Sequence, residues 1–307
     1  MDLVALQIFK AVAESGGISR AAARLHRVQS NVTTRVKQLE EHLGARLFHR
    51  RNRRLVLSDE GRLLLDYADR LLRLSSEAEA ALRGKGAPRG ALRLGSLEST
   101  AATRLPPLLA GYHRAWPEVA VELTTGTSGF LVERVLREEL DAAFVAEPFS
   151  AAGLACRHAF TERLVLVMPR SATSLERLPV LAFATGCSYR RRLETWLQRA
   201  EITPGRVMEY GSYHAIVACA AAGAGMAIVP ESVLGTMGAR RQVTVRPLPR
   251  DIAEARTMLI RREGSASAVL EALEGLLSAS RSAAPARSGA ATPAYRDAPR
   301  RRGSARP

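Results

Sequence analysis

The chemistry that this sequence offers most clearly lies within residues 29–37. Amide, hydroxyl and cationic side chains surround the apolar Val32 and Val36 in that segment. The polar members are Gln29, Asn31, Thr33, Thr34, Arg35 and Lys37. Glutamine, asparagine, arginine and lysine carry the donors and acceptors that match base edges in the major groove of DNA. Because a catalytic domain rarely needs such a surface, the segment predicts a face that reads nucleic acid.

Three helices are expected to position this face, over residues 3–14, 19–25 and 30–42. Apolar residues recur at helical spacing in the first and the third. Ser19 and Ser30 are suited to cap the second and third helices, and Gly44 stands where the third would end. The polar side chains then share the exposed side of the third helix.

A basic hairpin follows these helices. Residues 45–58 predict two short strands around a tip that contains Arg53 and Arg54. Helices and hairpin together predict a winged helix-turn-helix over residues 1–58, whose third helix enters the major groove while arginines of the wing reach phosphates. Solvated helix faces without a function are the alternative, but spacing, wing and charge agree on a DNA-binding module.

Residues 59–83 predict one long helix that joins two copies of the chain. Apolar residues keep the alternating three- and four-residue spacing of a coiled-coil seam, namely Leu64, Tyr67, Leu71, Leu74, Ala78 and Ala81. A homodimer is expected, because the third helix of each copy, called here the reading helix, then lies along one face of the DNA. Residues 84–90 contain glycines and a proline and predict a flexible linker.

From residue 91 to residue 280 the pattern changes to alternating short strands and helices. Strands are expected over residues 91–96, 119–126, 140–147, 163–169, 179–184, 206–210, 225–230 and 255–261. Helices are expected over residues 100–115, 129–139, 188–200, 212–223 and 265–279. This alternation predicts a mostly parallel α/β architecture with ligands at the carboxyl ends of the strands.

The positive charge is concentrated at the two ends of the chain. Residues 1–58 hold 11 lysines and arginines against 4 acids, and residues 281–307 hold 7 arginines against Asp297, within a net charge of +15 over 307 residues. This division predicts a nucleic-acid module attached to a nearly neutral domain with another task. The last segment has no periodicity and is expected to be a disordered basic tail, either adding non-specific DNA affinity or serving as a solvated extension.

Several other classes of protein fit the sequence less well. No apolar run approaches the roughly 20 residues that span a bilayer, and no secretory signal opens the chain, so a cytoplasmic protein without membrane contact is expected. Enzyme motifs for acyl transfer, phosphate binding and zinc hydrolysis are missing, so no catalytic residue, cofactor or metal is expected. A DNA-packaging protein is the third alternative, but it would leave the neutral domain without a task.

Three cysteines lie far apart at Cys156, Cys187 and Cys219, which is typical of a reducing compartment. They have no partner pattern for a zinc site. Small buried hydrophobic residues are the plain interpretation. A thiol redox sensor that uses Cys187 and Cys219 is the alternative.

Several motifs resemble the LysR-type transcriptional regulators. They are the early Phe9, SRAAARL at 19–25, Gln29, QLEEHLGARLFHR at 38–50 and LSDEG at 57–61. The resemblance covers most of the chain. It implies an α/β protein in which a winged helix-turn-helix and a long linker helix precede a two-lobe effector domain like that of a periplasmic binding protein. It also implies promoter DNA, a small-molecule effector and RNA polymerase as partners, and a homotetramer built from dimers.

The resemblance assigns positions to DNA. Those in the reading helix are Gln29, Ser30, Thr33, Thr34 and Arg35, and those in the wing are Arg53 and Arg54. Ser30 stands where the family commonly has proline, and Thr34 where it often has arginine. These departures leave the DNA-binding role intact and alter the expected base preference.

The resemblance also places an effector pocket between two lobes. Lobe I is expected at residues 91–160 and 255–280, and lobe II at 161–254. Loops after the strands would line the cleft between them. The residues expected there are Ser96, Glu98, Ser99, Thr100, Thr125, Ser128, Glu147, Ser188, Tyr189, Arg190, Tyr213 and His214.

The residues expected in the cleft suit two kinds of effector. The stretches CSYRR at 187–191 and SYHAIVACAAAGAGMAIVP at 212–230 look like the subgroup that includes a regulator of putrescine utilisation. Glu98 and Glu147 suit ammonium groups, with Tyr189 and Tyr213 as flanking aromatic faces. The serines at helix starts, together with Arg190, suit a carboxylate equally well. The effector is therefore expected to be a polyamine or an amino-acid-related metabolite, while capping or core packing is the alternative role for each residue.

Overall fold

The structure is a computed structural model that describes residues 1–51, 54–82, 87–265 and 267–282. Arg53, residues 84–86 of the expected linker and the tail from residue 283 lie outside the described residues. None of the described helices has the length and apolar character needed to cross a membrane.

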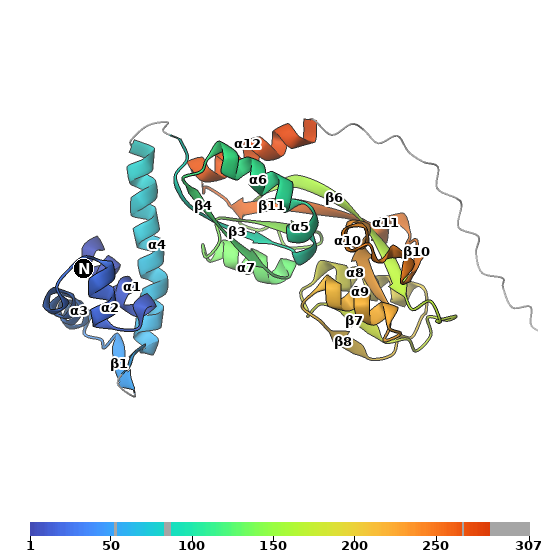
Figure 1. The fold of residues 1–307 in the computed structure, drawn as a ribbon, viewed down its shortest axis with the longest axis horizontal. Coiled ribbons are helices and arrows are strands. Elements are labelled where there is room, and N and C mark those ends of the chain that lie inside the picture. The colour runs from blue at the N-terminus through green and yellow to red at the C-terminus, as the bar shows by residue number, and fades with distance from the viewer. Residues whose placement is uncertain (52–53, 83–86, 266, 283–307) are drawn as a thin grey trace, which may run out of the picture.

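Three helices and a two-stranded wing form the N-terminal region (Figure 1). They are α1 (Leu3–Ser15), α2 (Ile18–Arg24), α3 (Gln29–Leu43), β1 (Phe48–Arg51) and β2 (Arg54–Leu57). The N-caps of α2 and α3 are Gly17 and Val28, two residues before the expected caps Ser19 and Ser30. Neither cap supplies a side-chain hydrogen bond. Ser30 lies instead in the first turn of α3, with its side chain exposed.

The core of this region is built around Phe9 of α1. Its side chain is fully buried, and its ring centroid lies 5.4 Å from that of Phe48 in the wing. Val32, Val36 and Leu39 of α3 pack into the same cluster. The apolar stripe of α3 therefore faces the core, which leaves the polar stripe to solvent.

The long helix α4 (Asp59–Leu82) begins in a tightly packed turn. Ser58 Oγ accepts a hydrogen bond from the Gly61 N–H at 2.8 Å and donates to the Arg46 carbonyl at 2.6 Å. A Cβ at Gly61 would lie 2.1 Å from the Leu47 carbonyl oxygen, so the close approach of helix and wing requires glycine.

The two apolar sides of α4 differ from the expected seam. Leu64 was assigned to the seam but packs, half-buried, against the core of the N-terminal region. The exposed apolar side consists of Leu63, Tyr67, Leu71 and Leu74. One face of α4 thus packs within this chain, and the other face is exposed and could pack against a second copy.

The C-terminal region contains a curled sheet in the order β10-β6-β11-β5-β3-β4, with β9 also paired to β6. Its strands are β3 (Gly90–Ser96), β4 (Val119–Thr125), β5 (Ala142–Ala146), β6 (Leu154–Met168), β9 (Ala227–Pro230), β10 (Thr244–Arg246) and β11 (Glu254–Arg262). β3 runs parallel to β4 and β5, whereas β6 and β11 pair antiparallel to their neighbours. The expectation of a mostly parallel sheet is wrong, because every pairing that β6 and β11 make is antiparallel.

β6 passes through both lobes. Residues 154–163 pair with β11, and residues 164–168 pair with β9 and β10. Only the second part was expected as a strand, since exposed and buried residues alternate irregularly in the first. β6 and β11 therefore form the crossing that connects the lobes.

Helices cover the sheet of each lobe (Figure 1). Lobe I carries α5 (Glu98–Thr103), α6 (Leu105–Ala115), α7 (Ser128–Leu136) and α12 (Ala268–Ser282). Lobe II carries α8 (Ser188–Arg199), α9 (Tyr213–Ala221), α10 (Glu231–Met237) and α11 (Arg250–Ala253), with β7 (Val180–Ala182) and β8 (Val207–Glu209). β10, α10 and α11 were not expected, because segments of three to seven residues have too little periodicity to detect.

An ion pair between a partly exposed arginine and a buried carboxylate joins the lobes near the crossing. Arg104, between α5 and α6, donates from Nε to Glu162 Oε1 on β6 at 2.6 Å. The Glu162 side chain is only 2% exposed. Ser232 of α10 donates to its other oxygen at 2.9 Å. Glu162 thus joins lobe I to lobe II through charge-assisted hydrogen bonds from Arg104 and Ser232.

A second polar cluster joins α4 to lobe I. Arg73 donates to the Glu138 carbonyl at 2.6 Å and to its carboxylate at 2.9 Å. Arg70 and Arg262 also pair with the Glu138 carboxylate. Lobe I is therefore in direct contact with the long helix.

Candidate functional site

The exposed side of α3 carries most of the polar residues expected there. Side chains of Gln29, Ser30, Asn31, Thr34 and Lys37 are exposed. They project from the N-terminal two-thirds of a helix that directly follows the turn after α2. In helix-turn-helix proteins this is the part of the second helix that meets base edges.

Thr33 and Arg35 are half-buried, and each has a partner within the protein. Thr33 Oγ1 donates to the Gln29 carbonyl at 2.9 Å. Arg35 Nη1 lies 3.6 Å from Asp2 Oδ2, while the other Asp2 oxygen caps α1 by accepting from the Ala5 N–H at 2.7 Å. Asp2 therefore holds the Arg35 guanidinium beside the reading face.

The wing that follows α3 has a basic sequence. β1 and β2 pair antiparallel from Phe48 opposite Leu57 to Arg51 opposite Arg54. Arg54 is the first residue of β2, and Arg53 lies outside the described residues. The hairpin itself, with its basic tip sequence, is as expected.

Replacing Arg35 by alanine is expected to weaken operator binding about tenfold. It should also reduce the slope of the logarithm of the binding constant against the logarithm of the salt concentration by about one per half-site. The fold should be unaffected, because an ion pair as exposed as Arg35–Asp2 contributes little to stability. Electrophoretic mobility shifts at several salt concentrations measure both values. Lys10→Ala is the control, since Lys10 faces Asp69 of α4 at 2.6 Å. Equal losses in the two variants would contradict a DNA contact by Arg35.

A second candidate site lies between the lobes and is called here the interlobe pocket. Lobe I contributes Leu97, Glu98, Gly126, Thr127 and Ala146, and lobe II contributes Phe183, Cys187, Ser188, Tyr189 and Tyr213. The space within it is only about 10 Å³, which is about the room that one water molecule needs. The pocket is therefore closed in this structure.

A buried hydrogen-bond cluster holds the pocket closed. Ser188 Oγ, at the start of α8 in lobe II, donates to the Ala146 carbonyl of lobe I at 2.7 Å. Ser128 Oγ accepts from the Ala146 N–H at 3.2 Å and lies 3.0 Å from Ser188 Oγ. A few hydroxyls thus join the ends of β5, α7 and α8.

Glu98 supplies the negative charge of the pocket. Its side chain is 22% exposed, and His214 Nδ1 lies 3.9 Å away. Ser212 Oγ donates to Glu98 Oε1 at 3.4 Å, so lobe II contacts this carboxylate from the start of α9. The carboxylate remains accessible enough to accept a further donor.

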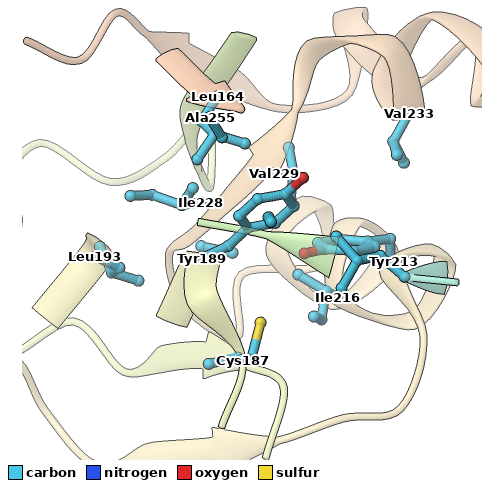
Figure 2. Close-up of a cluster of buried hydrophobic side chains, with 14 of the residues drawn as sticks. Leu164, Cys187, Tyr189, Leu193, Tyr213, Ile216, Ile228, Val229, Val233 and Ala255 are labelled. Carbon is cyan, nitrogen blue, oxygen red and sulfur yellow. The ribbon is translucent and has the colours of Figure 1, made fainter. Parts of the chain in front are cut away.

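Tyr189 and Tyr213 form the aromatic wall, which Figure 2 shows together with Cys187 in the core of lobe II. Their ring centroids are 6.4 Å apart, and Phe183 lies 4.7 Å from Tyr213. Burial raises the pKa of both tyrosines, so both hydroxyls are neutral at physiological pH. Burial also raises the pKa of the Cys187 thiol.

Four of the residues expected in the cleft line the interlobe pocket: Glu98, Ser188, Tyr189 and Tyr213. Four others are buried nearby without lining it: Ser96, Ser99, Thr100 and Ser128. Thr125 and His214 are exposed.

Two expected residues lie elsewhere. Glu147 lines a separate crevice. Arg190 pairs with Glu194 at 2.8 Å and with Glu209, so its guanidinium is occupied outside the pocket. Leu97 and Thr127 lie in the loops 96–100 and 125–128 that were expected to line the cleft, whereas the sequence pointed to neither Ala146 nor Phe183.

The N-terminal module, the exposed polar helix and the two-lobed domain define a DNA-binding transcriptional regulator with a small-molecule-binding domain. Residues 3–62 match the bacterial regulatory helix-turn-helix proteins of the lysR family, and residues 85–281 match the LysR substrate binding domain. The chain belongs to the LysR family.

Known proteins agree with this assignment over nearly the whole chain. The regulator YusT of Bacillus subtilis is 41% identical over 270 residues, which cover 85% of this chain and 89% of YusT. The structure of full-length CbnR with its target DNA is 26% identical, covers 91% of this chain and 100% of that one, and gives a TM-score of 0.64. Full-length OxyR from Pseudomonas aeruginosa, at 22% identity, shows the same fold with a TM-score of 0.67, covering 92% of this chain and 95% of its own.

The relatives also decide between regulator and enzyme. YusT, YofA and GltR of Bacillus subtilis are all named as HTH-type transcriptional regulators. The chain is accordingly a regulator and not an enzyme.

Proposed function

We propose that this regulator binds its promoter as a homodimer, or as a homotetramer of two dimers, under control of an amine-bearing effector in the interlobe pocket. The effector class is a polyamine or an amino-acid-related metabolite. One observation carries this choice: among the described residues that line the pocket, Glu98 is the one charged side chain. A carboxylate beside the Tyr189 and Tyr213 rings favours a cationic ligand.

The same pocket offers a place for a carboxylate. Thr127 and Ser188 lie where α7 and α8 begin, and the backbone N–H groups at helix starts favour anions. An α-amino acid would use both ends of the pocket, whereas a diamine such as putrescine would use Glu98 and the aromatic wall. The resemblance to a putrescine-utilisation regulator supports the second choice.

Ligand binding requires the lobes to separate, because the closed pocket has only about 10 Å³ of free space. The effector then favours a more open arrangement of the lobes than the one described here. Lobe I carries the α4 helix with it through Arg73 and Glu138. The angle between the two reading helices of a dimer would change, and with it the contact to promoter DNA or RNA polymerase.

The exposed apolar side of α4 supports the dimer. Leu63, Tyr67, Leu71 and Leu74 are exposed along one side of the helix, and a second α4 would cover them. Promoter binding also implies that the protein works in the cytoplasm, beside the chromosome.

DNase footprinting over the intergenic region upstream of the gene tests the proposal. Purified protein is combined with this DNA alone, with putrescine, and with each member of a panel of amino acids. We expect protection of an interrupted palindrome that shortens or shifts with one compound. Protection that no compound alters would reject the amine effector and keep the DNA-binding role.

Replacing Glu98 by glutamine is expected to raise the effector concentration for half-maximal footprint change about tenfold or more, because a charge-assisted hydrogen bond becomes a neutral one. DNA affinity without effector should stay the same. Glu122→Gln, which changes an exposed acid on β4, is the matched control. An unchanged response in the Glu98 variant would show that the ammonium group is not bound at this carboxylate.

A further inference from the structure

A second cavity, called here the flanking crevice, lies beside the crossing strands and has a volume of about 540 Å³. Lobe I and the crossing contribute Glu147, Cys156 and Met258, and lobe II contributes side chains of α8 and α11. It shares no lining residue with the interlobe pocket. The first turn of α8 faces the pocket, and Arg191, Arg192, Thr195 and Arg199 further along α8 face the crevice.

Two arginines in the crevice have no carboxylate partner. Among the described residues, no acid lies within 4.0 Å of the guanidinium of Arg191 or of Arg192. Arg192 is half-buried and donates only to carbonyl groups, those of Glu147 at 3.3 Å, Asp251 at 2.9 Å and Ile252 at 3.2 Å. Its guanidinium is thus positioned by both lobes without a direct ion pair among the described residues. Burial lowers the pKa of Arg192, and the nearby Tyr189, Glu147 and Asp251 offset part of this effect.

The two acids that line the crevice are already paired. Asp251 Oδ2 lies 2.5 Å from Arg199 Nη1, and Glu147 Oε1 lies 3.9 Å from Arg256 Nη1. Both acids also act on Arg192 from beyond ion-pair distance, but three arginines line the crevice against these two acids. The local balance of positive and negative side chains therefore favours binding of an anion.

The remaining lining is mainly apolar. Pro148, Phe149, Ile252 and Met258 form walls around the arginines. A volume of about 540 Å³ lies within the range of roughly 300–1,000 Å³ that is usual for small-molecule sites. Inorganic phosphate alone would leave most of this space and these walls without contact.

We infer that the flanking crevice is a second ligand site, which binds an organic anion with its carboxylate or phosphate on Arg191 and Arg192 and its apolar body against Phe149, Ile252 and Met258. This site goes beyond the amine site of the interlobe pocket in both place and charge. Because Arg192 contacts both lobes, an anion bound there acts on the same lobe arrangement as the effector.

Phenyl phosphate is a suitable probe, because it combines a dianion with an apolar ring. Binding to the full-length protein is measured by calorimetry, with inorganic phosphate as the probe that lacks the ring. We expect about one phenyl phosphate per chain and at least about tenfold weaker binding of inorganic phosphate, since burial of a ring contributes roughly this much. Equal affinities would overturn the apolar part of the inference.

The cysteines report which cavity the probe enters. Cys156 is exposed and lines the crevice, whereas Cys187 is buried and lines the interlobe pocket. Alkylation by iodoacetamide is followed at each cysteine by mass spectrometry. Burial, Glu147 and Glu263 raise the pKa of the Cys156 thiol, so the reaction is run at alkaline pH. Phenyl phosphate should slow alkylation of Cys156 and leave Cys187 unchanged, whereas protection of Cys187 alone would overturn the inference.

Two variants test the crevice without removing the bridge made by Arg192. Arg191→Gln should weaken phenyl phosphate binding about tenfold through loss of a charge-assisted contact. Ala151→Trp should block the probe by filling the crevice while keeping every arginine, since Ala151 is an exposed part of its lining. Arg114→Gln, on the exposed side of α6, is the matched control. Unchanged binding in both crevice variants would overturn the site.

Discussion

Replacing Phe9 by alanine should strongly weaken operator binding by destabilising the N-terminal region. The Phe9 side chain is fully buried and contacts Phe48 of the wing, so the change opens a cavity between helices and wing. Such substitutions cost about 3–5 kcal/mol. Small domains have a total stability of only about 5–15 kcal/mol, so a large share of it would be lost.

Thermal unfolding followed by circular dichroism, with DNA binding measured in parallel, tests this expectation. The N-terminal transition should fall by about 12 °C or more, while the effector domain keeps its own transition. Phe130→Ala is the matched control, because Phe130 is 39% exposed on α7. A Phe9 variant that melts and binds DNA like the parent would contradict the packing described here.

Replacing Arg104 by methionine should destabilise the effector domain by about 3–5 kcal/mol, because it leaves the Glu162 carboxylate buried without its cation. Glu162 is 2% exposed, and only Ser232 would still donate to it. The loss should appear as a lower urea concentration at the unfolding midpoint of the effector domain. The dependence of the unfolding free energy on urea concentration should stay unchanged.

The double variant Arg104→Met with Glu162→Gln should recover most of that stability, since a neutral amide can still accept from Ser232. Arg137→Met removes an exposed pair with Glu133 and should cost less than about 1 kcal/mol. If the single Arg104 variant cost no more than the Arg137 variant, the Arg104–Glu162 pair would not hold the lobes together.

Local patterns in the sequence were enough to predict α1, α3, the wing and α4. Their apolar residues recur at helical or alternating spacing, and Gly16 and Gly44 take the left-handed conformation at helix ends. The crossing could not be predicted in the same way. Pairing of β6 with β11 joins residues nearly a hundred positions apart, and spacing within one segment contains no information about such a partner.

The candidate sites show the same division. The polar face of α3 follows from helical period alone, because Val32 and Val36 define the buried side. Glu98 and Glu147 were expected in one cleft, since each follows a strand of lobe I. The structure separates them: Ala146 lines the interlobe pocket, and Glu147, the next residue, faces the flanking crevice. Successive residues of an extended chain point to opposite sides, and the expected cleft took no account of that alternation.

The position of β11 also determines how the chain is made. β11 lies between β5 and β6, although it follows the whole of lobe II in the sequence. As the ribosome extends the chain, the facing edges of β5 and β6 stay unpaired until residues 254–262 have emerged. Open strand edges pair readily with other chains, so the nascent protein is most exposed to aggregation during synthesis of lobe II. The order of synthesis thus makes lobe I, the first lobe translated, the last to be completed.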